Sequence, residues 1–169
     1  MKPFVLGNLA SLGDMVEVSC LGRRVVLNSQ ARARLRASRR IVGEYKLTRD
    51  DIEDQVRFPD AIARGAYPMS VQSPTQPNVR QHLFVRDGGD YDIPYRCLLP
   101  REMDGLLMAG RCLSATREAI GSARMGAQCM AYGHAAGVAA ALAARESVTP
   151  RDVNVQRLRG LLQEQRAIV

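Results

Sequence analysis

A stretch of twenty residues without a formal charge, 125–144, constrains the fold of this 169-residue chain most strongly. Alanine recurs every four residues before and along it, at Ala119, Ala123, Ala127, Ala131, Ala135, Ala139 and Ala143. Gly133, Gly137 and Ala141 mark a neighbouring stripe. The spacing predicts a helix over 123–144 with one side nearly bare of side chains, so that another backbone can pack closely against it.

An uncharged segment of this length is also long enough to span a bilayer. Against a membrane span, Ala and Gly gain little on entering lipid, and Gln128 and His134 would lie in the hydrocarbon interior. We therefore expect a buried helix of a soluble chain and no membrane partner. The apolar run at the N-terminus is interrupted by Gly7, Asn8 and Asp14, which makes a poor signal peptide, so a cytoplasmic location is expected.

The net charge of +7 is concentrated near the N-terminus, since residues 1–40 hold eight basic and two acidic side chains. Five of these are arginines within 32–40, a run that can bind nucleic-acid phosphates. However, no aromatic residue lies between positions 5 and 44 to stack on a base, and no zinc-finger pattern is present. GC-rich codon usage is the simpler explanation for the abundance of arginine. No nucleic-acid partner is expected.

The cysteines and histidines show no metal-binding or redox spacing. The four cysteines form no C-x-x-C pair, and His82 and His134 are far apart in the sequence. We therefore expect no metal site and reduced, mostly buried thiols. Cys112 is expected to be a small packing residue, because no second cysteine is positioned to form a disulfide with it. His134 is expected to be a hydrogen-bonded core residue.

Local signals predict several further elements. Thr48 resembles a helix N-cap that closes a capping box with Asp51, so a helix is expected over about 49–56. Residues 58–68 predict one more helical turn, and 69–80, with two prolines, a loop. Strands are expected at 24–28, at 39–47, in a β-hairpin over 82–87 and 91–99, and in a buried parallel strand at 106–110. An amphipathic helix is expected within 149–169, with Asn154 as N-cap and an apolar stripe of Val155, Leu158, Leu161 and Leu162.

The parallel strand, the loop after it and the start of the long helix form the most promising ligand site. Gly110 lets the chain turn tightly, and Arg111, Ser114 and Thr116 supply donors in the loop. Residues 121–126 open the helix with small side chains, and the free N–H groups of a helix start favour an anion or a partial negative charge. A ligand between strand end and helix start would meet both sets of donors. An ordinary strand–helix unit with a capped helix is the alternative.

Five ordered blocks resemble the C-terminal part of the FAD-dependent oxidoreductase family, whose members have a two-dinucleotide-binding-domain flavoprotein fold. The blocks are RRIVGEYKLTRDDI (39–52), FPDAIARGAYP (58–68), YDIPYRCLLP (91–100), DGLLMAGRCLSATREAIGSARMG (104–126) and MAYGHAAGVAAALAA (130–144). The resemblance spans about 37–169. It implies an α/β chain that forms the C-terminal part of a Rossmann-like FAD/NAD(P)-binding fold, namely its last parallel strand and long helix, with a closing amphipathic helix. Residues 1–38 would be a weakly patterned basic segment, 39–100 part of a β-rich substrate domain, and 101–169 part of the FAD-binding domain.

The resemblance also implies which residues bind the cofactor, FAD. In such flavoproteins the loop after the last strand runs beside the flavin, and the helix N-terminus points at the pyrimidine edge of the isoalloxazine. The residues that carry over are Ala109, Gly110, Arg111, Ser114, Arg124, Met125 and Gly126. A positive helix end at that edge stabilises the negative charge of a reduced flavin. No catalytic residue is identified.

No G-x-G-x-x-G follows a strand in this chain, so the motif that holds the FAD pyrophosphate is expected in an N-terminal half outside this sequence. The leading hypothesis is the C-terminal portion of an oxidoreductase that transfers hydride from a small organic substrate to FAD. The isolated chain is then expected to bind FAD weakly or not at all. The alternative is a non-catalytic fragment or split subunit completed by a partner with the G-x-G-x-x-G half, with a long exposed apolar surface along 119–143.

Other candidate residues fit structural roles. Tyr91 and Tyr95 are expected to pack rather than to line the site, although with Arg96 they could face the substrate. Arg39 and Arg40 are expected to be solvated or salt-bridged, and binding of a substrate carboxylate is their alternative role.

Overall fold

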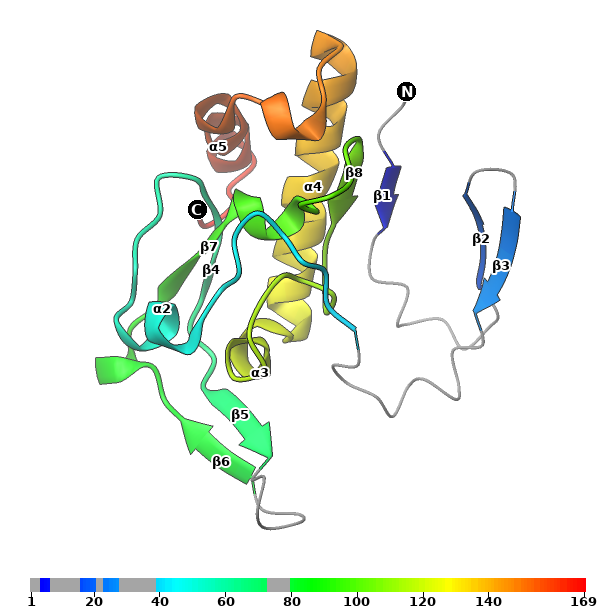
Figure 1. Ribbon diagram of the computed structural model, residues 1–169. Coiled ribbons are helices and arrows are strands. Elements are labelled where there is room, and N and C mark those ends of the chain that lie inside the picture. The colour runs from blue at the N-terminus through cyan, green and yellow to red at the C-terminus, as the bar shows by residue number, and fades with distance from the viewer. Residues whose placement is uncertain (1–3, 7–15, 21–22, 28–38, 73–79) are drawn as a thin grey trace.

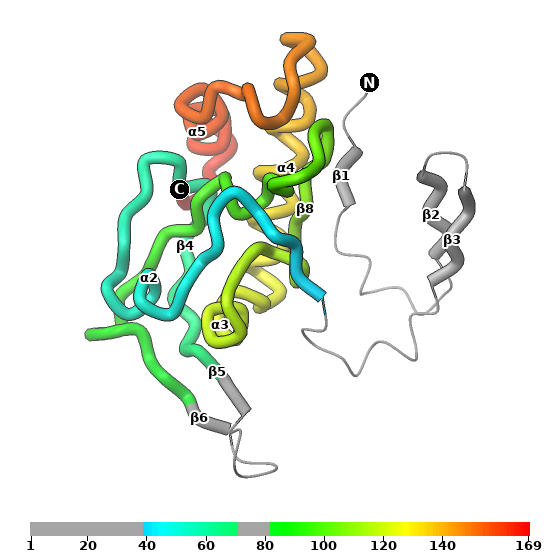
Figure 2. The backbone as a smooth tube through the Cα atoms, in the orientation of Figure 1, coloured from blue at the N-terminus to red at the C-terminus, as the bar shows by residue number. Residues whose placement is uncertain are grey.

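The computed structural model describes residues 4–6, 16–20, 23–27, 39–72 and 80–169 (Figures 1 and 2). Within them the chain is a mixed arrangement of helices and four two-stranded sheets. The strands are β1 (Phe4–Leu6), β2 (Val16–Cys20), β3 (Arg23–Leu27), β4 (Ala61–Gly65), β5 (Met69–Gln72), β6 (Arg80–Leu83), β7 (Tyr91–Pro94) and β8 (Leu106–Met108). The α-helices are α2 (Arg49–Glu53), α3 (Ala119–Ala123), α4 (Gly126–Glu146) and α5 (Val155–Glu164). The 3-10 turns are Arg86–Gly88, Tyr95–Leu98 and Pro150–Asp152.

The strand expected at 106–110 is confirmed as β8, which pairs in parallel with β1 through the register Phe4–Leu106. The short strand expected at 24–28 is β3, paired antiparallel with β2. Residues 29–38, for which the sequence allows either a helix or an extended basic arm, lie outside the described residues.

The β-hairpin expected between 82 and 99 is wrong. β6 pairs with β5, and β7 pairs with β4, in both cases antiparallel. A 3-10 turn at Arg86–Gly88, in which Asp87 takes a positive φ of 54°, separates β6 from β7. All four residues of β7 are buried, so this strand belongs to an internal sheet rather than to a surface hairpin.

The helical turn expected at 58–68 is also wrong, because Ala61–Gly65 forms β4. The loop expected at 69–80 is wrong at its start, where Met69–Gln72 forms β5. Four of the five residues of β4 are buried, and its partner β7 supplies the backbone hydrogen bonds. Tertiary pairing therefore overrides the helical preference of the two alanines in β4.

Residues 39–47 form an extended segment rather than the continuous strand expected there. The segment makes two isolated bridges, Gly43 with Pro100 and Leu47 with Ala115. Its backbone hydrogen bonds alternate between two neighbours: the Glu44 N–H donates to the Leu99 carbonyl at 3.0 Å, and the Leu47 N–H to the Ser114 carbonyl at 3.1 Å. Because the partners alternate, no regular ladder forms, yet the segment ties the two regions together.

The capping box at Thr48 is confirmed. The Thr48 hydroxyl accepts from the Asp51 N–H at 3.2 Å, and the Asp51 carboxylate accepts from the Thr48 N–H at 2.7 Å. α2 ends at Glu53, sooner than expected, and Gln55 beyond it has a positive φ of 53°. Ile52 anchors the helix in the core, since its side chain is fully buried.

The long helix expected over 123–144 is present as α4, but it is preceded by a separate helix, α3. The break falls at Arg124 and at Met125, whose backbone is extended. The alanine stripe faces the core at Ala135, Ala139 and Ala143, which are buried. The opposite side, with Met130 and Gly137 among its residues, is exposed.

His134 is exposed, so its expected place in the core is wrong; its Nε2 lies 2.5 Å from Gln165 Oε1 instead. The C-terminal helix is confirmed as α5, capped by Asn154, with Leu158 and Leu162 fully buried. None of the helices in the described part of the chain combines the length and the apolar character that a membrane crossing requires.

Two glycines make opposite demands on packing. A side chain at Gly65, in β4, would lie only 2.7 Å from the hydroxyl oxygen of Tyr91, whereas open space surrounds Gly137 on α4. We expect Gly65→Ala to lower the free energy of unfolding by about 1–3 kcal/mol through overpacking. Gly137→Ala, the matched control, should raise it by about 0.5–1 kcal/mol through helix propensity. Urea denaturation measures both, and equal effects would contradict the close contact at Gly65.

Candidate flavin-edge site

The carboxyl end of β8 and the N-terminus of α4 lie at the same end of the molecule (Figure 1). Residue Ala109, directly after β8, is 3% exposed, and Gly110 turns the chain with a positive φ of 96°. The turn is closed by the Leu113 N–H, which donates to the Gly110 carbonyl at 3.2 Å. Arg111 stands on this turn with its side chain exposed. The glycine is required here because φ is far into the region that side chains disfavour.

Ser114 is built into the fold rather than presented to a ligand. Its residue is 1% exposed, and its hydroxyl accepts from the Gly43 N–H at 3.1 Å. Thr116 is similarly occupied, since its hydroxyl accepts from the Ala119 N–H at 3.2 Å at the start of α3. Two of the loop donors expected from the sequence therefore fasten neighbouring segments instead.

Among the described residues, the N-terminus of α4 carries backbone donors without a capping side chain. The N-cap residue Met125 makes no side-chain hydrogen bond to it, its first turn has no acidic residue, and Gly126 is exposed with open space beside it. The Cys129 N–H donates to the Met125 carbonyl at 2.9 Å, so the N–H groups before it have no intrahelical acceptor. Together with the helix dipole, these groups form a positive site at the surface.

A buried chain of hydrogen bonds fixes the helical junction against the β4–β7 sheet. The Ser122 hydroxyl donates to the Tyr67 carbonyl, and the Tyr91 hydroxyl lies 2.5 Å from the Ser122 oxygen. Since the Ser122 proton is committed to Tyr67, Tyr91 donates to Ser122. Tyr91 in turn accepts from Gln128 Nε2 at 3.3 Å. The pKa of Tyr91 is raised, because the effect of burial exceeds the opposite effect of its hydrogen bonds to Ser122 and Gln128.

Sequence reasoning missed Ser122 and the hydrogen-bonding role of Gln128, and for Tyr91 it favoured packing over a place on the substrate face. The sequence offers only a weak indication of their role, namely two polar residues within an apolar helical stretch. Both are buried in the structure. Within the described residues, Gln128 Oε1 and the hydroxyl of Tyr132, one turn further along α4, have no hydrogen-bond partner. Burial raises the pKa of Tyr132 well above its usual value, so its hydroxyl stays protonated.

Two other residues weighed for the site, Tyr95 and Arg96, have structural roles. The Tyr95 hydroxyl donates to the Pro150 carbonyl at 2.8 Å, and Arg96 Nε donates to Asp60 at 2.9 Å. Cys112 is half-buried, and burial raises the pKa of its thiol as it does that of Cys129. Protonated, partly shielded thiols are consistent with the packing role expected for Cys112.

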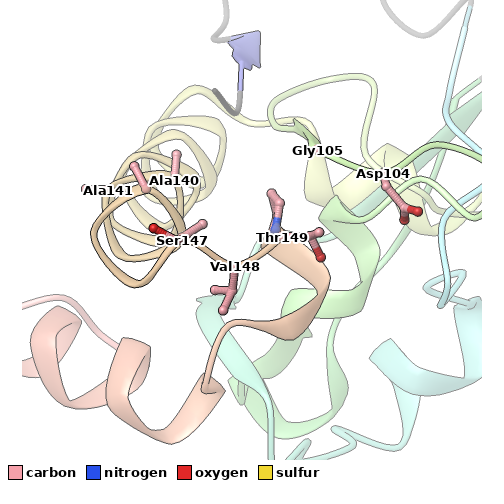
Figure 3. A pocket seen from close by; sticks show the side chains of 10 residues that line it. Asp104, Gly105, Ala140, Ala141, Ser147, Val148 and Thr149 are labelled. Atoms are coloured by element: carbon pink, nitrogen blue, oxygen red, sulfur yellow. The ribbon is translucent and has the colours of Figure 1, made fainter. Parts of the chain in front are cut away.

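A hollow of about 740 Å³ lies at the C-terminal end of α4. Figure 3 shows the side chains that line it. Its lining consists of Asp104, Gly105, Ala140, Ala141, Ala143, Ala144, Ser147, Val148, Thr149 and Pro150. None of the site residues expected from the sequence belongs to this lining. The hollow and the positive helix start are therefore separate features.

A family model described as FAD dependent oxidoreductase matches residues 17–162. The match covers most of the chain, so the chain belongs to the FAD-dependent oxidoreductase family, and FAD is the cofactor of that family. The match also extends the family region upstream from residue 37, where the resemblance begins, to residue 17. No curated protein matches the chain, and no solved structure does.

The residues at this end of the molecule fit a flavin. The pyrimidine edge of an isoalloxazine carries carbonyl oxygens, and the uncapped N–H groups at Gly126 and beyond are donors of the matching kind. The open space beside Gly126 leaves room for a flat ring to approach the backbone. When bound, FAD supplies the redox chemistry.

Two buried tyrosines allow a comparison between a hydrogen-bonded hydroxyl, that of Tyr91, and one without a partner in the described residues, that of Tyr132. We expect Tyr91→Phe to lower the free energy of unfolding by about 1–3 kcal/mol, because it leaves the Gln128 amide without its acceptor. Tyr132→Phe should cost nothing or stabilise, since it removes a hydroxyl with no partner in the described residues. Both tyrosines are fully buried, so the pair is matched, and urea denaturation is the measurement. An equal loss from both variants would refute the assigned network.

Proposed function

We propose that this chain forms the flavin-edge wall of an FAD-dependent oxidoreductase and that its β8–α4 unit is the C-terminal part of a Rossmann-like FAD-binding fold. The observation that carries the proposal is the uncapped N-terminus of α4 beside the carboxyl end of β8. Ligands in open α/β sheets occupy this position. In this reading residues 101–169 belong to the FAD-binding domain, and residues 39–100 contribute to the substrate domain.

The proposed roles follow the local geometry. Ala109, Gly110 and Arg111 border the flavin at the turn, and the junction at Arg124, Met125 and Gly126 presents backbone donors to its pyrimidine edge. Ser114, buried under Gly43, holds the loop in place rather than contacting the flavin. The reaction would be hydride transfer from a small organic substrate to FAD.

Gly126 offers a direct test, because it is the first residue of α4 and its neighbour Met125 is already extended. Gly126→Pro deletes one N–H while fitting a helix start, and Gly126→Ala keeps that N–H as the matched control. We expect the chain to bind FAD weakly, with a dissociation constant of about 1 mM, and to lose it on gel filtration. In fluorescence titrations the proline variant should bind several-fold more weakly than the alanine variant.

Equal FAD affinity of the two variants would contradict the role of the helix start. Retention of stoichiometric FAD by the purified chain would contradict the proposal that a G-x-G-x-x-G half is needed for tight binding. Both outcomes are read from flavin absorbance and fluorescence, with circular dichroism to establish that the variants are folded.

A second candidate function is a split subunit, favoured by the exposed side of α4. The stripe at 119–143 proposed as its surface is largely buried within the chain, so the interface would use the neighbouring stripe. That stripe has open space at Gly133 and Gly137, which lets a partner backbone come close, and Met130, one turn before Gly133, is exposed.

The split-subunit proposal predicts a stoichiometric complex with a protein that carries the G-x-G-x-x-G motif, isolated from cells that make this chain. Gly137→Glu should abolish the complex by placing a charge in the interface, whereas Arg86→Glu, on the remote 3-10 turn, should leave it intact. Mass spectrometry of the isolated complex identifies the partner. A monodisperse monomer under all conditions would overturn this candidate.

A further inference from the structure

Gly43 is packed too closely to carry a side chain. A Cβ at this position would lie 2.7 Å from the Cβ of Ser114 and 3.2 Å from the carbonyl oxygen of Arg96. Ser114 is 1% exposed and Arg96 is met at its backbone, so neither neighbour can move aside easily. The φ angle of Gly43 is not positive, so glycine is required here for space rather than for backbone conformation.

Hydrogen bonds hold the segment around Gly43 against the loop that follows β8. The Gly43 N–H donates to the Ser114 hydroxyl at 3.1 Å, and two residues earlier the Ile41 N–H donates to the Cys112 carbonyl at 2.9 Å. Further along, the Leu47 N–H donates to the Ser114 carbonyl at 3.1 Å. The segment therefore follows the loop in the same direction and is bonded to it at three points.

The same segment is also bonded to residues 96–99. The Tyr45 N–H donates to the Arg96 carbonyl at 3.3 Å, and the Glu44 N–H donates to the Leu99 carbonyl at 3.0 Å. In the proposed division of the chain, the segment and these residues belong to the substrate part, whereas the loop after β8 belongs to the FAD-binding part. The segment therefore joins the two parts.

The loop that is held in this way carries the turn beside which the flavin is proposed to lie. Gly110 turns the chain with a φ of 96°, and the Leu113 N–H closes the turn on the Gly110 carbonyl at 3.2 Å. Leu113 is fully buried and directly precedes Ser114. A change at the contact between Gly43 and Ser114 therefore reaches the turn through a single peptide bond.

We propose that Gly43 is a positioning residue for the flavin, which fixes the turn at Gly110 from the substrate part of the chain without touching the cofactor. The inference rests on the proposed function and deepens it, because the affinity of the turn for FAD then depends on where the substrate segment lies. Displacement of the segment from Ser114 loosens the turn and weakens FAD binding. By linkage, FAD bound at the turn stabilises the contact between Gly43 and Ser114.

Gly43→Ala in the whole chain tests the proposal, with Asn154→Ala as the control. The first variant overpacks the contact with Ser114, and the second removes the cap of the remote helix α5. Without flavin, hydrogen exchange measured by NMR should be about tenfold faster at the Leu113 N–H in Gly43→Ala than in Asn154→Ala. The Leu158 N–H, in α5, should show the reverse order.

FAD affinity separates a positioning role from a purely structural one. In fluorescence titrations Gly43→Ala should bind FAD about fivefold more weakly than the parent chain, whereas Asn154→Ala should bind it equally well. Ser114→Ala is the second variant, because it removes the acceptor of the Gly43 N–H without adding atoms, and it should act in the same direction as Gly43→Ala.

Two outcomes would overturn the proposal while the parent chain binds FAD. One is equal exchange at Leu113 in Gly43→Ala and Asn154→Ala, and the other is unchanged FAD affinity in a variant whose turn exchanges faster. A parent chain that binds no FAD would contradict the proposed function as well, so titration of the parent distinguishes the two failures.

Discussion

The close contact between β4 and α4 at Gly65 is the constraint on which the rest of the structure depends. A glycine at this position leaves room for the side chains of Tyr91 and Gln128 to meet behind the strand. Through Tyr91 the contact reaches Ser122 in α3 and the carbonyl of Tyr67. Buried polar groups are costly unless they are paired, so this chain of hydrogen bonds permits few other arrangements of the two helices.

Fixing α3 against the sheet also determines where α4 begins. The chain turns at Arg124 and Met125, and the free N–H groups of α4 then open toward the end of the molecule where β8 finishes. The extended segment 39–47 holds the loop after Gly110 through Ile41 and Ser114. The positive end of α4 and the turn after β8 thus lie at the same end of the molecule, and the proposed flavin site rests on this arrangement.

Sequence reasoning succeeded where the signal was local. The capping box at Thr48, the N-cap at Asn154 and the apolar strand that ends at a glycine each depend on a few neighbouring residues. It failed where pairing is remote. No feature within 58–68 indicates that β4 pairs with β7 about thirty residues later. The predictions of a helical turn and of a β-hairpin were wrong for this reason.

The candidate site shows the same division. The turn at Gly110 and the helix start at Gly126 follow from glycine positions and helix periodicity, and both were located closely. The burial of Ser114 and the network around Ser122 depend on segments that approach from 31 to 71 residues away. The break before α4 was missed because Arg124 and Met125 are ordinary helix-forming residues, and the tertiary contact, not local propensity, ends α3.

The central claim is that the turn after β8 and the start of α4 together form a flavin-binding edge. The most direct test is an NMR titration of the ¹⁵N-labelled whole chain with FAD, followed by mapping of the backbone amide shifts. The account predicts saturable shifts at residues 110–114 and 125–128, with little change around the hollow that Ala140 and Ser147 line. Saturable shifts confined to that hollow, with the helix start unaffected, would contradict it.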